Sequence, residues 1–177
     1  MPETTPTSSQ DRGPEIFTLA QIQHLTRVEF SRAQRYGYPL VCLMIGVDRL
    51  EHVRDRLGYD AKQIVMDRVV ELLGRETRTS DFIGRLPDDR FLIVVPHARL
   101  DRIEVLAARL LAAARELDLA QLEHDLALSL SIGGSWLAEG ETIFFDDLLH
   151  AAEECLERAA AEGGDCYVAR APGVERR

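Results

Sequence analysis

The chain has 177 residues, 46% hydrophobic and 29% charged, a composition typical of one folded globular domain. A formal net charge of −9 argues against nucleic acid as a partner, because non-specific binding to it depends on a basic surface. No run reaches the roughly 18 apolar residues of a membrane span, and the polar N-terminus lacks a signal-peptide core. We therefore expect a cytoplasmic protein with no membrane contact. The cysteines lack metal-binding or redox spacing and are predicted to be buried thiols: Cys42, Cys155 and Cys166.

The first part of the chain predicts a disordered tail, a helix and a central strand. Residues 1–15 are rich in Pro, Thr and Ser, a composition typical of disorder. Residues 16–35 predict a helix, and Leu40–Val47 is apolar on both faces, as expected of a strand inside a sheet. The apolar side chains of the helix recur near helical spacing and are expected to face the core: Leu19, Ile22, Leu25, Val28 and Phe30.

Two further helices are predicted after this strand. Asp48–Leu57 is short and highly charged, and Gly58 ends it. A longer helix is expected to begin with Asp60 as its N-cap and to run to about Thr77, because apolar residues follow helical spacing along it.

A β-hairpin is the next predicted element. Phe82–Leu86 and Phe91–Val95 are short, largely apolar runs on either side of Pro87–Arg90, whose proline and charges are typical of a tight turn. Pro96 ends the second strand.

The remaining residues predict a helix, a strand, a second helix and a short last strand. The helices are expected over Leu100–Leu117 and Phe144–Glu162. Asp125–Gly133 alternates apolar and small polar residues, which predicts a strand with one half-covered face. Tyr167–Ala169 forms the last strand, and residues 171–177 are a tail.

The central order β-αα-β-β-α-β predicts a ferredoxin-like fold of the α/β (α+β) class, with a mixed, mostly antiparallel sheet flanked by helices. We expect a single domain over residues 16–170.

From about Ala33 to Val168 the sequence resembles the GGDEF domains, diguanylate cyclases that join two GTP molecules into cyclic di-GMP. In that family the first strand ends in D-x-D-x-F-K-x-x-N-D, and G-H-x-x-G-D follows. The hairpin then carries R-x-G-G-D-E-F, a late strand S-x-G, and the last helix A-D-x-A-L-Y-x-A-K-x-x-G-R-N. The stretches of this chain that match these motifs in order are Gly46–Asp55, Gly58–Gln63, Arg85–Phe91, Ser131–Gly133 and Ala152–Asp165.

The resemblance implies that the catalytic residues have mostly been replaced. The metal-binding aspartate of the first strand falls on Gly46, which has no side chain. The signature glycines fall on Pro87 and Asp88, where a fixed φ and an added side chain oppose close approach to phosphate. Asp89 keeps one carboxylate, whereas Arg90 reverses the charge of the other.

The GTP-contacting positions are also altered. The guanine-reading residues fall on Arg54 and Gln63, and the phosphate-holding Lys and Arg of the last helix fall on Ala160 and Gly164. We therefore predict no catalysis, no cofactor and no bound metal. Two alternatives stay open, namely a metal held by the aspartates near the turn and a residual cyclase activity. The aspartates concerned are Asp48, Asp88 and Asp89.

One functional motif of the family is retained. Many members carry R-x-x-D five residues before the signature, an inhibitory site for an intercalated dimer of cyclic di-GMP. Arg78 and Asp81 have that spacing from Pro87, and Arg109 falls where a second arginine completes the site. Arginine binds phosphate or the guanine O6/N7 edge in bidentate fashion, and a carboxylate accepts from guanine N–H groups.

We therefore predict a catalytically inactive domain that binds cyclic di-GMP through these three residues and signals to a protein partner or a second copy. The alternative interpretation is a ligand-free protein-interaction scaffold. In that case Arg78 and Asp81 bond to each other or to solvent, and Arg109 is one more exposed arginine.

Overall fold

The computed structural model describes residues 15–123 and 126–173, and within them six strands form one sheet. The strand order is β1-β3-β4-β2-β5-β6. The strands are β1 (Ile16–Phe17), β2 (Leu40–Val47), β3 (Phe82–Arg85), β4 (Phe91–Pro96), β5 (Leu130–Leu137) and β6 (Cys166–Ala169).

The centre of the sheet confirms the ferredoxin-like prediction. β2 pairs antiparallel with β4 on one side and with β5 on the other, and β3 pairs antiparallel with β4. The short outer strands are parallel additions, β1 beside β3 and β6 beside β5. The sheet is therefore mixed and mostly antiparallel.

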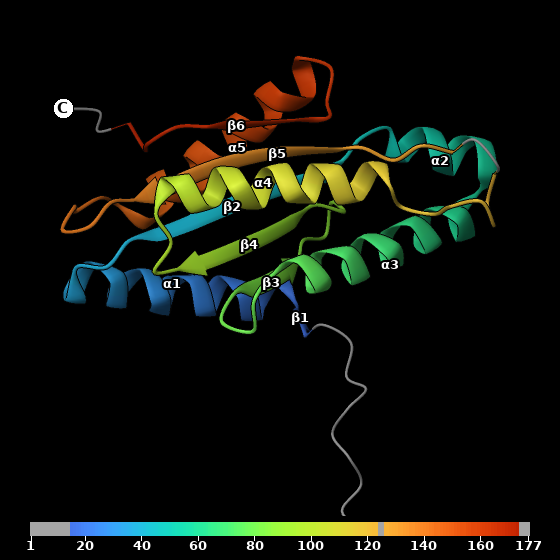
Figure 1. Cartoon of the computed structure of the whole chain (residues 1–177). Helices are drawn as coiled ribbons and strands as arrows, with labels where there is room; N and C mark the ends of the chain where they lie inside the picture. Colours follow the sequence, from blue (N-terminus) through green and yellow to red (C-terminus); the bar gives the residue numbers. More distant parts are fainter. Residues whose placement is uncertain (1–14, 124–125, 174–177) are drawn as a thin grey trace, which may run out of the picture.

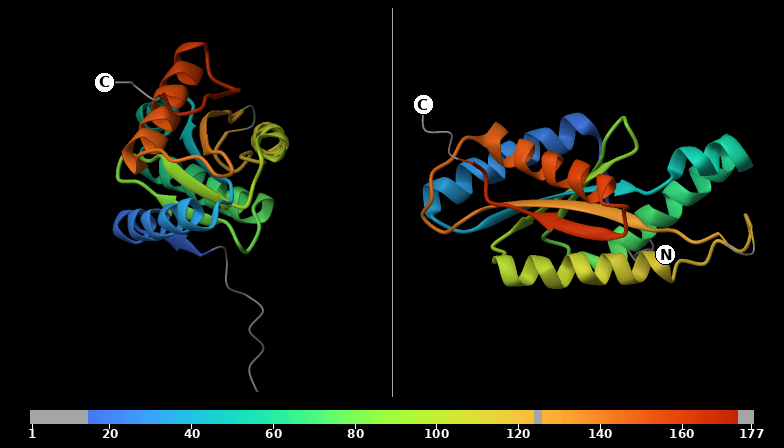
Figure 2. Two further views of the ribbon diagram at one scale, coloured as in Figure 1. Left: turned by 90° about the vertical axis from the view of Figure 1, so that its left-hand side faces the viewer. Right: turned by 90° about the horizontal axis from the view of Figure 1, so that it is seen from above.

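The helices cover both faces of the sheet (Figures 1 and 2). α1 and α5 pack on one face, over side chains such as Cys42 and Met44 of β2. The opposite face, with Leu43 and Ile45, packs against α2, α3 and α4. The bounds of the helices are α1 (Leu19–Tyr36), α2 (Leu50–Leu57), α3 (Tyr59–Glu76), α4 (Leu100–Arg115) and α5 (Phe145–Ala161).

The start of the first helix differs from the prediction. Ile16 and Phe17 form β1 instead, because they pair with Ile83 and Gly84 of β3, a tertiary contact without a local sequence signal. Thr18 caps α1, and its side chain and that of Gln21 make a capping box. The expected inward position of Val28 is also wrong, since this side chain is exposed.

Two other predicted boundaries are wrong. α3 begins after Gly58 and has no side-chain cap, so Asp60 lies in its first turn. β5 lies further along the chain than predicted, because β2 fixes its extent: Val47 pairs with Leu130, and Leu40 with Leu137. β5 is buried on both faces rather than half covered.

Some predictions concern residues outside the described ranges. The N-terminal tail falls on residues 1–14, the C-terminal tail largely on 174–177, and the start predicted for the late strand on Asp125. Among the described helices, none is both long enough and apolar enough to cross a membrane.

The close contact between α5 and the sheet predicts that alanine substitutions at two glycines beneath this helix differ in their effect on stability. A Cβ at Gly133 would lie 2.1 Å from the backbone nitrogen of Leu156, whereas a Cβ at Gly46 would meet a Leu156 methyl at an ordinary 3.5 Å. We expect Gly133→Ala to cost about 1–3 kcal/mol or more through overpacking, and the matched Gly46→Ala variant to cost clearly less. Urea unfolding measures both, and equal losses would contradict this account of the packing.

Candidate functional site

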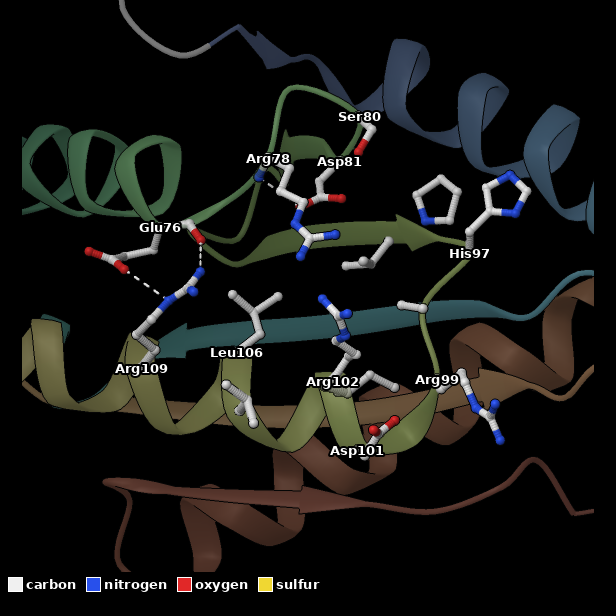
Figure 3. A pocket seen from close by; sticks show the side chains of 15 residues that line it. Glu76, Arg78, Ser80, Asp81, His97, Arg99, Asp101, Arg102, Leu106 and Arg109 are labelled. Atoms are coloured by element: carbon white, nitrogen blue, oxygen red, sulfur yellow. Dashed lines mark hydrogen bonds and ion pairs between the residues drawn. The ribbon is translucent and has the colours of Figure 1, made fainter.

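A cavity of about 440 Å³ lies at the open end of the β3–β4 hairpin, between the loop that precedes β3 and helix α4 (Figure 3). All three predicted ligand-binding residues line it. The polar and charged side chains around the cavity are Glu76, Arg78, Ser80, Asp81, His97, Arg99, Asp101, Arg102 and Arg109.

Arg78 and Asp81 are held by a tight turn. The backbone nitrogen of Arg78 donates to the Asp81 carboxylate at 2.8 Å, and the backbone nitrogen of Asp81 donates to the Arg78 carbonyl at 3.0 Å. Partial burial raises the pKa of the Asp81 carboxyl, and the backbone bond and charge of Arg78 oppose part of that rise. The turn fixes the backbone and leaves the Arg78 guanidinium in the cavity.

Arg109 is anchored rather than free. Its guanidinium contacts Glu76 twice, with Nε 3.1 Å from the carboxylate and Nη2 donating to the backbone carbonyl. Because Glu76 is the last residue of α3, this pair fixes the end of α3 to α4. These two bonds leave only the other N–H groups of the guanidinium as donors that a ligand could use.

Arg102 is a cavity residue that the sequence reasoning missed. Figure 3 shows the Arg78 and Arg102 side chains reaching toward each other, whereas Arg99 is turned away. Arg102 stands seven residues before Arg109 on α4, so the two lie on one helix face. That spacing was the available signal.

The cavity has an excess of positive charge in an acidic protein. Four arginines line it against three carboxylates, Glu76, Asp81 and Asp101. Within the described ranges, no ion pair involves Arg78 or Arg102. Two facing guanidinium groups repel each other unless an anion lies between them, so this arrangement suits a ligand with phosphate groups.

The residues that the family resemblance places at the cyclase metal site lie at the other end of the hairpin. Side chains there form hydrogen bonds and ion pairs within the chain. Gly46 pairs with Ser131 in the β2–β5 ladder. The neighbouring Asp48 carboxylate accepts from Ser129 at 2.7 Å, from Ser131 at 2.6 Å and from the Asp165 backbone nitrogen at 2.9 Å. Asp48 thus ties the ends of β2, β5 and β6 together.

Asp89 is held by two cations of the chain. Lys62 Nζ lies 2.6 Å from its carboxylate and Arg85 Nη2 lies 2.9 Å from it. Burial raises the pKa of Asp89, but the bonds to Lys62 and Arg85 outweigh it and leave the pKa below its usual value. The buried Lys62 stands where the G-H-x-x-G-D motif has its second glycine. The family resemblance did not reveal this lysine's role, because its partner lies on another element.

The other aspartate of the turn is also paired. Asp88 bonds to Nε of Arg90 at 2.5 Å, and Arg90 lies 3.7 Å from Glu153 of α5. In the ranges 15–123 and 126–173, no cluster of three or more His, Cys, Asp or Glu side chains has the proximity needed to hold a metal ion.

The remaining altered positions lie apart from the R-x-x-D cavity. Arg54 pairs with Glu51 and Asp55 on α2, and Gln63 lines a hollow beside Pro87 and Asp89. Gly46, Arg90, Ala160 and Gly164 line a second hollow. A Cβ at Gly164 would lie 2.6 Å from the Asp48 carboxylate, so the phosphate-holding arginine of the family does not fit there without a shift.

Solved structures place the fold in a known class, the GGDEF-type domain. The diguanylate cyclase SiaD of Pseudomonas aeruginosa, solved with its activator SiaC, matches with a TM-score of 0.80 and 26% identity over 88% of this chain and 59% of SiaD. A microbial GGDEF domain described in an interaction with cyclic di-GMP matches with a TM-score of 0.75 and 28% identity over 88% and 92% of the two chains.

Sequence comparison then assigns the family. Residues 14–166 match the family described as "Diguanylate cyclase, GGDEF domain". The diguanylate cyclase DosC of Escherichia coli (strain K12) is 30% identical over 136 residues, which are 76% of this chain and 29% of DosC. The chain belongs to the GGDEF family, and it spans under a third of the length of this curated relative.

The Lys62–Asp89 pair predicts a pH-dependent loss of stability. We expect Lys62→Met to lower the free energy of unfolding by about 1–3 kcal/mol at neutral pH, because Asp89 keeps its charge and loses a partner. The lowered pKa of Asp89 means that its contribution is present above the unfolded value of about 3.9 and is lost as the pH falls through the folded pKa. The hydrogen bond to Asp89 raises the pKa of Lys62, so its contribution is complete below about pH 10.4 and is lost as the pH rises through the folded pKa.

Urea unfolding of wild type and Lys62→Met across pH checks this prediction. The difference between them should be largest from about pH 5 to 10 and should shrink below about pH 4. Lys62→Met/Asp89→Asn serves as the control and should recover part of the loss, since it removes both charges. A loss of the same size at pH 3 and pH 7 would refute the ionic explanation.

Proposed function

We propose that this GGDEF domain is a cyclic di-GMP receptor without cyclase activity. Arg78, Asp81 and Arg109 hold the ligand, and Arg102 adds a fourth contact. The observation that carries the proposal is that these four side chains line one cavity, while the cyclase positions at the other end of the hairpin have internal partners. The binding unit is the domain over residues 16–170, acting in the cytoplasm.

The ligand assignment rests on the hydrogen-bonding chemistry of two guanidinium groups and one carboxylate in the cavity. Arg78 and Arg102 present planar, permanently charged forks that bind phosphate oxygens or the O6/N7 edge of guanine and stack on its ring. The Asp81 carboxylate, partly buried, accepts from the N1–H and N2–H groups of guanine. The cavity thus offers groups for both parts of a guanine nucleotide. The 28% identical GGDEF domain that interacts with cyclic di-GMP supports the same ligand class.

The loss of catalysis rests on the charge at the former metal site. Phosphoryl transfer there depends on carboxylates that hold divalent ions beside the triphosphate. Gly46 supplies none, Arg90 carries the opposite charge, and the Asp89 carboxylate is bonded to Lys62 and Arg85. Binding two metal ions would require these internal bonds to break without a replacement for the missing charge.

Signal output requires a partner that distinguishes the free from the bound domain. The relative SiaD is solved in complex with an activator protein, so a protein partner is known for one GGDEF protein. We propose that this domain likewise transmits ligand occupancy to a protein partner or to a second copy. A differential contact in the two states is needed for this.

Isothermal titration calorimetry with cyclic di-GMP tests the binding proposal. We expect saturable heat for the wild type and about 10- to 100-fold weaker binding for Arg78→Ala and for Arg102→Ala, because each removes a charge-assisted hydrogen bond of about 1.5–3 kcal/mol. Arg68→Ala, an exposed arginine of α3 paired with Glu71 and outside the cavity, is the matched control and should bind as the wild type does. A site with a Kd of about 1 µM (about −8.2 kcal/mol) is nearly saturated at about 50 µM ligand. The absence of heat at that concentration would favour the ligand-free scaffold.

Incubation with GTP and Mg²⁺ or Mn²⁺ tests the loss of catalysis separately. We expect no cyclic di-GMP by chromatography, because the charge that binds the metal ions is missing. Product formed by the wild type would show a residual cyclase. Product that persists in Asp89→Asn would point to contamination, since that variant loses the last signature acid.

A further inference from the structure

The exposed face of α1 is basic, in contrast to the acidic chain as a whole. His24, Arg27, Arg32 and Arg35 are exposed along this helix. Its sole carboxylate, Glu29, is buried and accepts a hydrogen bond of 2.6 Å from the Tyr38 hydroxyl. Arg32 lies 3.7 Å from this carboxylate, and among the described residues Arg27 and Arg35 have no ion pair, so the outer surface of α1 keeps a positive charge.

The neighbouring helix α5 has the opposite character. Asp146, Glu154 and Glu157 are exposed on its outer face, and its first turn also contains Asp147. Arg158, its single arginine, is paired with Glu162 at the C-cap, and Glu154 is paired with Arg170 and lies 3.5 Å from His150. A basic helix and an acidic helix therefore share one face of the sheet.

Direct contacts fix how these two helices lie relative to each other. Phe30 of α1 packs edge-on against Phe145 of α5 with ring centroids 5.4 Å apart, and the Arg27 guanidinium lies 4.4 Å from the Phe145 centroid. Gln34 Nε2 donates to the Ile143 carbonyl, just before α5. The C-terminal part of α1 thus lies beside the start of α5, and the helices run in opposite directions (Figure 2).

Exposed apolar side chains lie on the same two helices. Tyr36, at the end of α1, is 69% exposed, and Phe144, at the start of α5, is 79% exposed. Val28, near the middle of α1, is also exposed. Uncovered aromatic rings at one end of a charged surface are typical of a protein–protein contact.

We propose that the α1–α5 face is a homodimer surface in which α1 of each copy lies on α5 of the other. The two-fold axis of this dimer runs parallel to the helices and lies between the two copies, above the line where α1 meets α5. Each copy then uses the same patch, so the contact forms a closed dimer. It sets the basic helix on the acidic one and brings Tyr36 over Phe144 of the second copy. An axis across the helices would instead stack α1 on α1, with arginine against arginine, which is unfavourable.

The dimer surface is separate from the R-x-x-D cavity, so its test does not depend on cyclic di-GMP binding. The cavity is lined by α4 and the loop before β3, on the opposite side of the sheet from α5. Failure of one proposal therefore leaves the other standing.

Sedimentation equilibrium of the full chain without nucleotide is the first measurement. We expect a monomer–dimer equilibrium that weakens as salt rises from about 0.01 M to 1 M, since the Debye length falls from about 30 Å to about 3 Å. A protein that stays monomeric at all salt and protein concentrations overturns the proposal.

Charge reversal then identifies the surface. The α1 variant Arg27→Glu/Arg35→Glu and the α5 variant Asp146→Arg/Glu157→Arg should each dissociate about 100-fold more easily, because like charges then face each other. Mixing the two variants should restore a dimer, in which both contacts pair acid with base. The control Arg68→Glu/Arg75→Glu places the same charge change on α3 and should dimerise as the wild type does.

Circular dichroism and urea unfolding of every variant establish that the domain remains folded. A wild-type dimer that the α1 and α5 variants do not weaken would show that the copies meet through another surface. Variants that are monomeric alone and stay monomeric when mixed would refute the α1-on-α5 arrangement.

Discussion

The burial of β2 is the constraint on which the other elements depend. This strand is apolar on both faces, so it needs a sheet neighbour on each side and a helical layer above and below. β4 and β5 supply the neighbours, in registers that run from Leu40 to Ile45 and from Leu40 to Val47. Its C-terminal end, with Gly46 and the following Asp48, is thereby fixed next to the hairpin turn, where the family resemblance implies a metal site.

At that end of the sheet, the acidic side chains are held by internal partners. Asp48 has three donors, Asp88 has Arg90, and Asp89 has Lys62 and Arg85. Lys62, Arg85 and Arg90 place positive charge beside Asp88 and Asp89, which lowers the repulsion between these neighbouring carboxylates.

The sequence predicted the elements whose signal is local, and it failed where a tertiary contact decides. The two apolar faces of β2, the hairpin and the helix at α4 are visible in residue patterns. β1 is not, because Ile16 and Phe17 are extended only through pairing with β3. The limits of β5 follow the length of β2 rather than its own alternation.

The candidate site likewise contains residues with a local sequence signal and residues that only a tertiary contact identifies. Arg78 and Asp81 lie in one local motif that the sequence displays, whereas the Lys62–Asp89 pair joins α3 to the hairpin turn and has no such motif. Arg102 is an intermediate case. Its spacing from Arg109 is local, but its relevance depends on the loop that faces α4 across the cavity.

A chain of contacts joins the cavity to the proposed dimer surface. His97 lines the cavity and stacks on the Tyr38 ring with centroids 3.9 Å apart. The Tyr38 hydroxyl donates to Glu29 of α1, and burial together with this bond raises the pKa of Tyr38 to about 12, so the phenol keeps its proton throughout the physiological range. These contacts form a continuous path from the cavity to α1. Coupling further requires that the ligand and the second copy each bind one position of α1 better than another, because a path of contacts alone changes neither affinity.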